Sequence, residues 1–398
     1  MSGTSLDGLD LCAAEFERFG DRWTYRIHAF ETITYRGTPW PERLAAAYSD
    51  RGALRTQISL DFASWCQDQW LAFGSRHHFA AHAVAHHGHT VEHDPSRGIT
   101  VQIGHEALVF ASSPIPVVGD FRSGSVARGG QGAPLVPLAD RDLFADFAVC
   151  VNLGGFSNAS WTDAGGLRRA GDLGPCNGLL NPLAGELGLD YDPEGQHAAR
   201  GRVAPSSLAS SSLASSSLAN PQTSQEPTSQ SQPISANEPI SANLSQRANE
   251  PISANLSQLN YYSAPFPKSL GREWMEREFW PVFNSARPPR TEDALATASA
   301  HIAWSIVHGL RTAHAPHGKA LLSGGGARNA HLARQLCQIS PEWHWMVAPD
   351  DILESKEALA FAYLGLLRLR NEPNVLACYA GGQNDGCDGT VFGKFDQT

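Results

Sequence analysis

The chain has 398 residues, of which 42% are hydrophobic and 18% are charged, and its formal net charge is −10. This length suits two domains of ordinary size better than one small core. The excess of acidic side chains repels phosphate backbones and argues against nucleic acid as a partner. No apolar run reaches the roughly 18 residues that a membrane helix needs, and residues 1–5 lack the basic and then apolar pattern of a secretory signal.

Seven cysteines are scattered along the chain, and none of them forms a C-x-x-C pair. An odd number of unclustered cysteines argues against both a disulfide framework and a zinc finger. The sequence therefore predicts a reducing, cytoplasmic compartment and no membrane association.

The predicted elements alternate between strands and helices in both halves of the chain. Short apolar runs bounded by glycine or proline predict buried strands, and apolar residues at helical spacing predict helices. In chain order these are strands at 11–16 and 23–35, one or two helices within 56–85, strands at 99–103, 115–118 and 148–153, a helix at 292–313, a strand at 319–322, a helix from Ala330 and a last helix at 355–370 with Ser355 as its N-cap. Such interleaving predicts an α/β fold.

Seven of the sixteen histidines lie between residues 77 and 93. Three of them, His78, His82 and His86, have the i, i+4, i+8 spacing of one helix face, which is also a spacing of metal ligands. Because no H-E-x-x-H motif is present, we interpret the cluster mainly as solvated helix surface, with a metal site as the weaker alternative.

Residues 205–260 are rich in Ser, Ala, Asn, Gln and Pro and almost lack aromatic side chains. Ser-Leu-Ala-Ser-Ser recurs from Ser207, and Glu-Pro-Ile-Ser-Ala-Asn occurs at 238–243 and again at 250–255. Such a composition cannot bury enough apolar surface to offset the entropy of ordering it. The segment is therefore predicted to be a disordered, low-complexity insertion.

Residues 1–10, Met-Ser-Gly-Thr-Ser-Leu-Asp-Gly-Leu-Asp, place two glycines and two acids before a strand. A P-loop is excluded, because it needs a lysine and leads into a helix. The composition suits a tight turn whose backbone N–H groups and hydroxyls face phosphate oxygens, with Asp7 or Asp10 near a Mg²⁺ ion. An ordinary polar turn is the alternative.

Two further glycine motifs follow apolar strands. Val151–Ser160 reads as a strand, a Gly-Gly turn and a second strand, which repeats the arrangement of the first motif in the second half of the chain. Leu321–Asn329 places three glycines between a strand and a helix, where a flat ligand can lie against the backbone. A plain hairpin and tight helix–strand packing are the alternatives.

Two segments carry candidate sugar-binding or acid–base side chains. Asp120 and Arg122 are two residues apart on a predicted strand, so they point the same way beside the glycine-rich loop at 129–135. Asp172 lies in the Gly/Pro-stiffened turn at 171–177, a suitable place for a general base. A surface ion pair and ordinary turn chemistry are the alternatives.

Taken together, these motifs resemble one family, the anhydro-N-acetylmuramic acid kinases of the actin-like sugar kinase and heat-shock ATPase superfamily. The resemblance covers essentially the whole chain outside the insertion, and the motifs follow the family's order. They are M-S-G-T-S-L-D-G-L-D (1–10), H-H-G-H-T (86–90), V-G-D-F-R-S (118–123), G-G-Q-G-A-P-L (129–135), V-N-L-G-G-F-S-N (151–158), G-D-L-G-P-C-N (171–177), P-K-S-L-G-R-E (267–273), S-G-G-G-A-R-N (323–329) and E-S-K-E-A-L-A-F-A (354–362).

The resemblance implies two actin-like (ribonuclease-H-like) domains around a nucleotide cleft, at 1–138 and 139–398, the second interrupted by the 205–260 insertion. It implies ATP and Mg²⁺ as cofactors and an anhydro amino sugar as substrate, and it leaves a homodimer open. In the implied reaction, ATP phosphorylates the 6-oxygen of 1,6-anhydro-N-acetylmuramic acid while water opens the anhydro bridge. The products are N-acetylmuramic acid 6-phosphate and ADP, in the recycling of cell-wall (peptidoglycan) sugars.

The family's site residues carry over onto matching positions of this chain. By resemblance, Asp172 deprotonates the attacking water, while phosphoryl transfer depends mainly on positioning and charge neutralisation. Asp7 is the implied Mg²⁺ ligand. The implied nucleotide contacts are Gly3, Thr4, Ser5, Leu6, Asp7, Gly8, Leu9, Asp10, Gly154, Gly155, Gly324, Gly325 and Gly326, and the implied sugar contacts are Asp120, Arg122, Gln131 and Asn177.

The chain departs from the family pattern at several positions. Leu173 and Cys176 replace the Thr and Gly of D-T-G-P-G-N, and Cys176 is costly if that position needs a positive φ. Ser125 and His89 replace the usual Asp and Gln. The family has a strand before the first glycine turn, so we expect either an upstream start or a weakened nucleotide site. Two alternatives stay open: a nucleotide-binding relative without turnover, and a superfamily kinase for another sugar or a carboxylate.

Overall fold

The computed structural model describes residues 1–3, 6–204 and 254–394. The candidate contacts Thr4 and Ser5 lie outside the described residues, as do residues 205–253 of the predicted insertion. All other candidate site residues are described.

The fold resumes earlier than the predicted end of the insertion at residue 260. Helices α9 (Ala254–Ser257) and α10 (Asn260–Ser263) are described there. The Leu256 side chain is buried in the large core of the upper half of the molecule. The predicted end of the insertion is therefore wrong by at least seven residues, because burial of the Leu256 side chain attaches this polar segment to the core.

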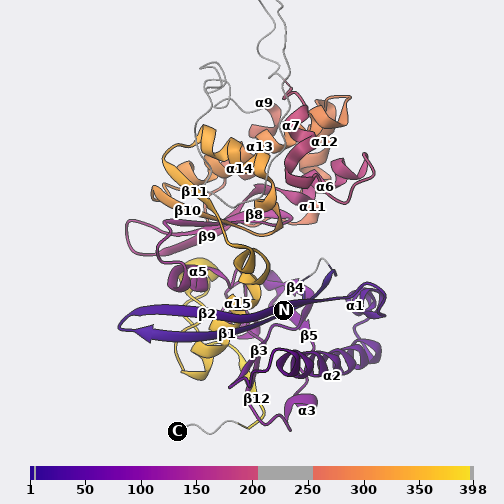
Figure 1. Cartoon of the computed structure of the whole chain (residues 1–398), viewed down its shortest axis with the longest axis vertical. Helices are drawn as coiled ribbons and strands as arrows, with labels where there is room; N and C mark the ends of the chain where they lie inside the picture. The colour runs from indigo at the N-terminus through magenta and orange to yellow at the C-terminus, as the bar shows by residue number, and fades with distance from the viewer. Residues whose placement is uncertain (4–5, 205–253, 395–398) are drawn as a thin grey trace, which may run out of the picture.

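A five-stranded sheet forms the centre of the upper half of the molecule (Figure 1). Its strand order is β11-β10-β7-β8-β9, in which β7, β10 and β11 are parallel and β8 runs antiparallel to both of its neighbours. The strands are β7 (Val149–Leu153), β8 (Phe156–Thr162), β9 (Arg168–Pro175), β10 (Gly318–Ser323) and β11 (Trp343–Val347). The longer helices from Pro137 onward are α5 (Pro137–Leu143), α6 (Asn177–Gly185), α13 (Thr291–Thr312), α14 (Ala330–Ile339) and α15 (Asp350–Leu369).

The two faces of this sheet belong to two different cores, because side chains alternate along each strand. Val149 and Val151 face the large core that includes α6, α13 and α14. Cys150, Ala170 and Leu321 face a second core, which they share with α5 and α15. The sheet is thus covered on both sides, and its second face looks toward the lower half of the molecule (Figure 1).

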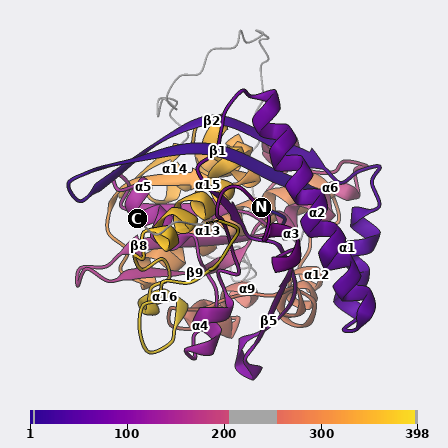
Figure 2. The same cartoon turned by 90° about the horizontal axis from the view of Figure 1, so that it is seen from below.

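The lower half is crossed by a long antiparallel hairpin, β1 (Gly8–Phe19) and β2 (Arg22–Thr34), which Figure 2 shows from below. Its residues Leu9 and Leu11 pack with α1 and α2 in a third core. Two smaller sheets complete this half, with strand orders β12-β6-β3 and β4-β5. The bounds are α1 (Trp40–Ser49), α2 (Ala53–Arg76), β3 (Val84–His86), β4 (His89–Asp94), β5 (Ile99–Ile103), β6 (Val117–Gly119) and β12 (Thr390–Phe392).

The remaining elements are short. They are the α-helices α3 (Ala107–Phe110), α4 (Ser123–Ala127), α7 (Gln196–Arg200), α11 (Arg272–Trp274), α12 (Trp280–Ser285) and α16 (Ala377–Ala380), the 3₁₀ turns at Pro95–Arg97, Pro193–Gly195 and Gly325–Arg328, and a π-helical turn at Met275–Phe279.

Helix α15 joins the two halves. It packs against β1 and β3 below and against β10 above. After α15 the chain returns to the lower half, where β12 pairs antiparallel with β6 (Figure 1). The lower half is therefore built from both ends of the chain, and the division at 138/139 stays a prediction.

A buried polar network holds α15 to the upper sheet through α5. The Lys356 Nζ lies 2.8 Å from Asp140 Oδ1, an ion-pair contact in which the side chains are only 8% and 7% exposed. Asp140 Oδ2 accepts a hydrogen bond from Ser160 Oγ of β8, and Arg168 Nη2 of β9 donates to the same hydroxyl. Burial lowers the pKa of Lys356, but the attraction of Asp140 outweighs this and leaves the pKa raised.

Helix α2 ends at Arg76, so the predicted helix over 56–85 is wrong beyond that residue. His78 and His82 lie exposed in the following loop, whereas His86 is buried in β3 against the rings of Trp70 and Phe110. The three histidines therefore do not share a helix face. Burial lowers the pKa of His86 well below its ordinary value, so it packs as a neutral ring.

Most other predicted elements are confirmed, but the start predicted for the last helix is wrong. The strand at 99–103 and the helix start at Ala330 match β5 and α14. Helix α15 begins at Asp350 with Pro349 as its N-cap, five residues before the predicted start. Ser355 is buried inside that helix, where its hydroxyl donates to the Asp351 carbonyl.

A cavity of about 1240 Å³ lies between β1, α2 and α15, and it is lined mainly by apolar side chains. Neither of the glycine turns at 154–155 and 324–326 lines it. Within residues 1–3, 6–204 and 254–394, every helix is too short or too polar to cross a lipid bilayer.

Candidate active site

The β7–β8 hairpin carries the predicted Gly154-Gly155 turn at the carboxyl end of a parallel strand. The start of α6 closes onto this turn: the Asn177 N–H donates to the Gly154 carbonyl, and the Cys176 and Gly178 N–H groups donate to Gly155, all within about 3.0 Å. The strand–turn–strand prediction is confirmed. The turn is held from one side by the backbone of α6.

The glycine triplet at 324–326 packs directly on the end of β7. Gly324 has a φ of +78°, and a Cβ there would lie 2.5 Å from Asn152 Oδ1. A Cβ on Gly326 would lie 2.9 Å from the Leu153 carbonyl oxygen. Both positions therefore require glycine for this close approach, and the two glycine motifs form one surface.

Each of these turns also has one glycine that faces open space. Apart from the adjoining chain itself, no heavy atom of the described residues lies within 4 Å of the Cβ position of Gly155 or of Gly325. The backbone is thus bare at these two points, which is what a ligand lying flat on the turns needs.

Asn177 lies with the glycine turns rather than with the other implied sugar contacts. Its Nδ2 donates to the Leu153 carbonyl at 3.2 Å, and its Oδ1 would lie 3.0 Å from a Cβ on Gly326. The neighbouring Cys176 is buried and has a negative φ of −141°. The cost that was expected there for a positive φ therefore does not arise.

A row of polar side chains crosses one face of the upper sheet. Asn152 of β7 pairs with Asn158 of β8, and Asn158 pairs with Asp172 of β9. Directly opposed residues in antiparallel strands place their side chains on the same face. Asp172 shares that face with Ala170 of the second core, so it looks toward the lower half of the molecule.

Asp172 is held in place by the segment that follows the undescribed region. Its Oδ2 accepts a hydrogen bond from the Leu270 N–H at 2.7 Å, and its own N–H donates to the Lys268 carbonyl at 2.9 Å. Tyr261 Oη donates to the Asp172 carbonyl. Burial raises the pKa of Asp172 to about 6, although the Leu270 N–H opposes this shift. A carboxyl that titrates near neutral pH has the affinity for a proton that a general base needs.

Lys268 is a residue that sequence reasoning missed. Its Nζ donates to the Tyr261 carbonyl at 3.0 Å and lies over the rings of Tyr261 and Phe266. Burial lowers its pKa to about 8. Its motif P-K-S-L-G-R-E was a signal for the family, but the role of the segment in holding Asp172 depends on tertiary contacts.

The first glycine turn leads into β1 as predicted. Leu6 has a φ of +58° and its N–H donates to the Gly3 carbonyl, while the Asp10 N–H donates back to the Met1 carbonyl at 2.8 Å. Asp10 is half-buried and accepts a hydrogen bond from Thr32 Oγ1 at 2.6 Å. Burial raises its pKa, and the Thr32 hydrogen bond opposes this.

The candidate metal ligand Asp7 lies exposed on this turn, and its carbonyl accepts the Tyr35 N–H. The described residues contain no group of three or more His, Cys, Asp and Glu side chains arranged to hold a metal ion.

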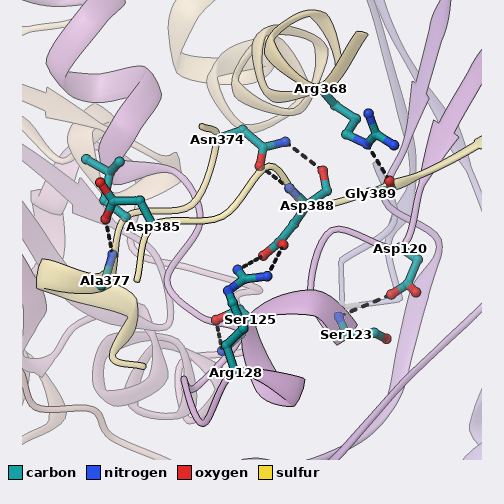
Figure 3. A network of polar contacts seen from close by, with 12 residues as sticks. Asp120, Ser123, Ser125, Arg128, Arg368, Asn374, Ala377, Asp385, Asp388 and Gly389 are labelled. Carbon is teal, nitrogen blue, oxygen red and sulfur yellow. Dashed lines mark hydrogen bonds and ion pairs between the residues drawn. The ribbon is translucent and has the colours of Figure 1, made fainter. Parts of the chain in front are cut away.

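Asp120 and Arg122 lie after strand β6, so their predicted place on a strand is wrong. Asp120 has a φ of +57°, which ends the strand, and its Oδ1 accepts the Ser123 N–H (Figure 3). Arg122 donates to His87 Nε2 and to the Gly132 carbonyl. Because it accepts from Arg122, the buried His87 is neutral, and its pKa lies well below its ordinary value through burial. Arg122 thus lies against the glycine-rich loop, whereas Asp120 contacts the start of α4.

Glu357 of α15 is the second residue that sequence reasoning missed. Its pKa is raised, chiefly by desolvation, while Arg122 attracts the charged form and Asp10 repels it. Glu357 nevertheless keeps an exposed surface, so it lies in a recess rather than in the core. It therefore brings Asp10 of the first turn and Arg122 into one electrostatic environment. Glu357 belongs to the family motif E-S-K-E-A-L-A-F-A at 354–362, but the motif alone did not indicate a function for this residue.

The same helix also reaches the glycine triplet. Arg328, which follows the triplet, forms ion pairs with Asp350 and Glu354 of α15. Charge interactions link Glu354 to Asp10. The structure thus connects the first turn, α15 and the triplet. Among the described residues, no hydrogen bond or ion pair joins Asp172 directly to Arg122 or to the glycine-rich loop.

The chain is similar in sequence to proteins that share one name. The sequence profile described as anhydro-N-acetylmuramic acid kinase matches residues 1–225 and 241–394. A protein named anhydro-N-acetylmuramic acid kinase from Cupriavidus pinatubonensis is 31% identical over 98% of this chain and 96% of its own length. Proteins of the same name from Synechococcus elongatus and Pseudomonas fluorescens are 31% and 30% identical, over 99% and 92% of this chain and 98% and 90% of their own lengths. The chain therefore belongs to the anhydro-N-acetylmuramic acid kinase family.

Proposed function

We propose that this protein uses ATP and Mg²⁺ to phosphorylate the 6-oxygen of 1,6-anhydro-N-acetylmuramic acid while water opens its anhydro bridge. Family membership supports a kinase. The ring-opening step is supported by one observation above all. Asp172 is a half-buried carboxyl with a raised pKa, fixed by the Leu270 N–H on the sheet face that looks toward the lower half of the molecule, which contains Arg122 and its loop.

The fold supports this proposal as well. In the upper sheet, the antiparallel β8 lies between β7 and β9, and the glycine turns sit at the carboxyl ends of β7 and β10. We infer that this sheet is one actin-like domain and that the lower half is the other. Ligands of open α/β sheets bind beyond the carboxyl ends of the strands, which is where these turns lie.

The residues present fit a nucleotide. The bare backbone at Gly155 and Gly325 offers N–H groups to a polyphosphate and room for a flat base or ribose. Asp7 and Asp10 are the carboxylates nearest the first turn. A Mg²⁺ ion that is bound to a nucleotide takes one or two carboxylates with phosphate oxygens and water, so it needs no cage of protein ligands. When bound, Mg²⁺ would neutralise charge on the transferring phosphoryl group.

The ring-opening chemistry falls to the chain's own side chains. The ionised Asp172 carboxylate takes a proton from water, so that the oxygen attacks the anomeric carbon as the anhydro bond breaks. The freed 6-oxygen then receives the phosphoryl group. Arg122, Asp120 and Gln131 bind the sugar and orient it, and the neutral His87 keeps the Arg122 guanidinium in place.

The test is an ADP-release assay with the full chain. ADP should form with ATP, Mg²⁺ and 1,6-anhydro-N-acetylmuramic acid together, and omission of the sugar should abolish it. N-acetylmuramic acid and N-acetylglucosamine serve as the non-anhydro controls. Equal ADP release without the anhydro sugar, or faster release with a non-anhydro sugar, would contradict the proposal.

Replacing Gly325 with Leu should raise the KM for ATP by about tenfold or more while the Tm changes little. The Cβ position of Gly325 faces open space, so the new side chain would enter the space over the turn without a clash at its Cβ. Steady-state kinetics and thermal unfolding check this. Gly185→Leu at the end of α6 is the matched control, because its Cβ position is equally open. An unchanged KM for ATP in Gly325→Leu would remove the triplet from the nucleotide site.

A further inference from the structure

The segment that follows α15, residues 371–392, makes backbone contacts with the glycine-rich loop at 129–132, and we call it the C-terminal strap. The Gln131 N–H donates to the Ala380 carbonyl at 2.7 Å, and Gly130 forms an isolated β-bridge with Gly381. A Cβ on Gly130 would lie 2.9 Å from the Gly381 carbonyl oxygen. The two backbones are thus so close that any shift of the strap moves the loop.

An ion pair between the half-buried Arg128, which caps the end of helix α4, and the buried Asp388 holds the strap at this point. Arg128 Nη1 and Nη2 donate to the two carboxylate oxygens of Asp388, both at 2.7 Å, and Asp388 is 3% exposed (Figure 3). Such two-pronged pairs fix geometry as well as charge. Arg128 directly precedes the glycine-rich loop, so the pair fixes the loop at its root.

Hydrogen bonds fix the backbone of the C-terminal strap at Asp388. The Asp388 N–H donates to Asn374 Oδ1 at 2.6 Å, and Asn374 Nδ2 donates back to the Asp388 carbonyl at 2.7 Å (Figure 3). Asn374 is fully buried and also donates to the Leu364 carbonyl of α15. Arg368 Nε donates to the Gly389 carbonyl. The carboxylate that grips Arg128 is therefore anchored to α15.

The other side of the strap meets the strand that carries Asp172. Helix α16 of the strap packs against β9, and Tyr379 and Ala380 share a core with Ala170. Ala170 and Asp172 lie on the same face of β9. The strap is thus placed between the strand that carries Asp172 and the loop that carries Gln131.

The glycine-rich loop at 129–132 exposes the side chain of Gln131. The Gln131 side chain is exposed although its N–H is bound to the strap. On the far side of the loop, the Gly132 carbonyl accepts from Arg122 Nη1 at 2.7 Å. The loop therefore lies between Arg122 and the strap, and its spacing from Asp172 is set by the strap.

We propose that Arg128 and Asp388 are positioning residues for the sugar: through the C-terminal strap they hold the 129–132 loop at a fixed distance from Asp172. This inference rests on the proposed function, because it takes Gln131 and Arg122 as the sugar contacts. Neither Arg128 nor Asp388 touches the substrate. Their contribution is to bring the loop to its bound position before the sugar arrives, which lowers the ordering cost of binding.

The test is the variant Asp388→Asn, with KM measured separately for the two substrates. Loss of one charge should raise the KM for the anhydro sugar by about tenfold, while the KM for ATP and kcat should each change less than about threefold. Arg128→Lys keeps the positive charge but cannot donate to both carboxylate oxygens of Asp388 in the same geometry. It should change the three kinetic constants in the same way as Asp388→Asn. Asp146→Asn is the matched control, because its ion pair with Arg22 is exposed at 67% and 61%.

A second readout does not depend on sugar turnover. In native-state hydrogen exchange, the Gln131 amide should exchange at least tenfold faster in Asp388→Asn than in the parent, because its acceptor lies on the strap. Amides of α13 should be unchanged. If ADP release proves independent of the anhydro sugar, the proposed function fails, and this exchange measurement still decides whether the pair holds the loop.

Three outcomes would overturn the inference. A lowered Tm with both KM values unchanged would make the pair merely structural. An equal rise in the KM for ATP would mean that the effect is not confined to the sugar loop. Unchanged exchange at Gln131 would show that the loop does not depend on the pair. If Asp388→Asn does not fold, Arg128→Lys decides among the same outcomes.

Discussion

Asp172→Asn is expected to lower kcat by ~10²–10⁴, the usual contribution of a positioned general base. The amide keeps the shape and can still accept the Leu270 N–H, but it cannot take a proton from water. The affinity for ATP should stay nearly unchanged. Steady-state kinetics together with calorimetric titration of a non-hydrolysable ATP analogue measure both quantities.

The matched control for this substitution is Asp68→Asn, which removes an exposed carboxylate from α2. It should leave kcat within about twofold of the parent. Full activity of Asp172→Asn would take Asp172 out of the mechanism and would leave the row of Asn152, Asn158 and Asp172 as a structural feature.

The pH profile gives an independent check on the same group. The base must be ionised, and burial raises the pKa of Asp172 to about 6. The value of kcat/KM for the sugar should therefore fall about tenfold per pH unit below pH 6 and level off above it. A flat profile down to pH 4.5 would exclude a base that titrates near 6.

The same pKa shift predicts a gain in stability when Asp172 is replaced by Asn. The folded state holds the proton more tightly than the unfolded chain, whose pKa is near 3.8, so ionisation of Asp172 costs stability as the pH rises from about 4 to 6. The amide of the Asp172→Asn variant does not ionise and carries no such cost, so at pH 8 the variant should be more stable by about 1–3 kcal/mol. Thermal unfolding at pH 8 and at pH 4 checks this, since the gain should vanish at the lower pH.

Lys356→Met is expected to destabilise the protein by about 3–5 kcal/mol, because it leaves the Asp140 carboxylate buried without its partner. The effect should be large since this contact joins α15 to α5 and, through Ser160, to the upper sheet. Urea unfolding followed by far-UV circular dichroism measures it. Lys319→Met, at an exposed position of β10, is the matched control and should change stability by less than about 0.5 kcal/mol.

A double variant separates loss of packing from loss of charge balance. Asp140→Asn added to Lys356→Met removes the orphaned charge and should restore about half of the lost stability. A loss below about 1 kcal/mol for Lys356→Met alone would show that the Asp140 carboxylate reaches solvent or protonates without cost.

Local patterns predicted the elements that bear the glycine turns. The β7–β8 hairpin and the strand that leads into Gly324 are marked by short apolar runs that end in glycine, and the structure confirms both. These signals lie within a few residues of one another, so no tertiary information was needed. The close packing of Gly324 and Gly326 on β7 could not be read in this way, because it joins segments far apart in the chain.

The histidine-rich segment at 77–93 is a place where the predicted helix was wrong. Its alanines and histidines resemble an exposed helix, but the helix ends at Arg76 and His86 enters a buried strand. A neutral imidazole packs edge-on against Trp70 and Phe110 as any flat ring does. A hydropathy pattern counts histidine as polar and cannot anticipate this.

The roles predicted for the site residues stay predictions, whereas the structure corrects part of their predicted geometry. Asp172 was placed in a turn, whereas it lies on strand β9 and is fixed by a segment almost 100 residues away. No sequence pattern indicated a function for Glu357 or for the Arg128–Asp388 pair. Their contacts depend on how α15 and the C-terminal strap pack against the rest of the protein. Long-range placement of this kind is decided by the packing of whole elements.

The most direct measurement of the proposed reaction is the mass of the sugar product formed from 1,6-anhydro-N-acetylmuramic acid and ATP in H₂¹⁸O. Water that opens the bridge leaves its oxygen on the anomeric carbon, so the product should gain one phosphoryl group and one labelled water. The label should be absent from the phosphate. A phosphorylated product that keeps its anhydro bridge, or a label on the phosphoryl group, would contradict attack on the sugar by water that Asp172 activates.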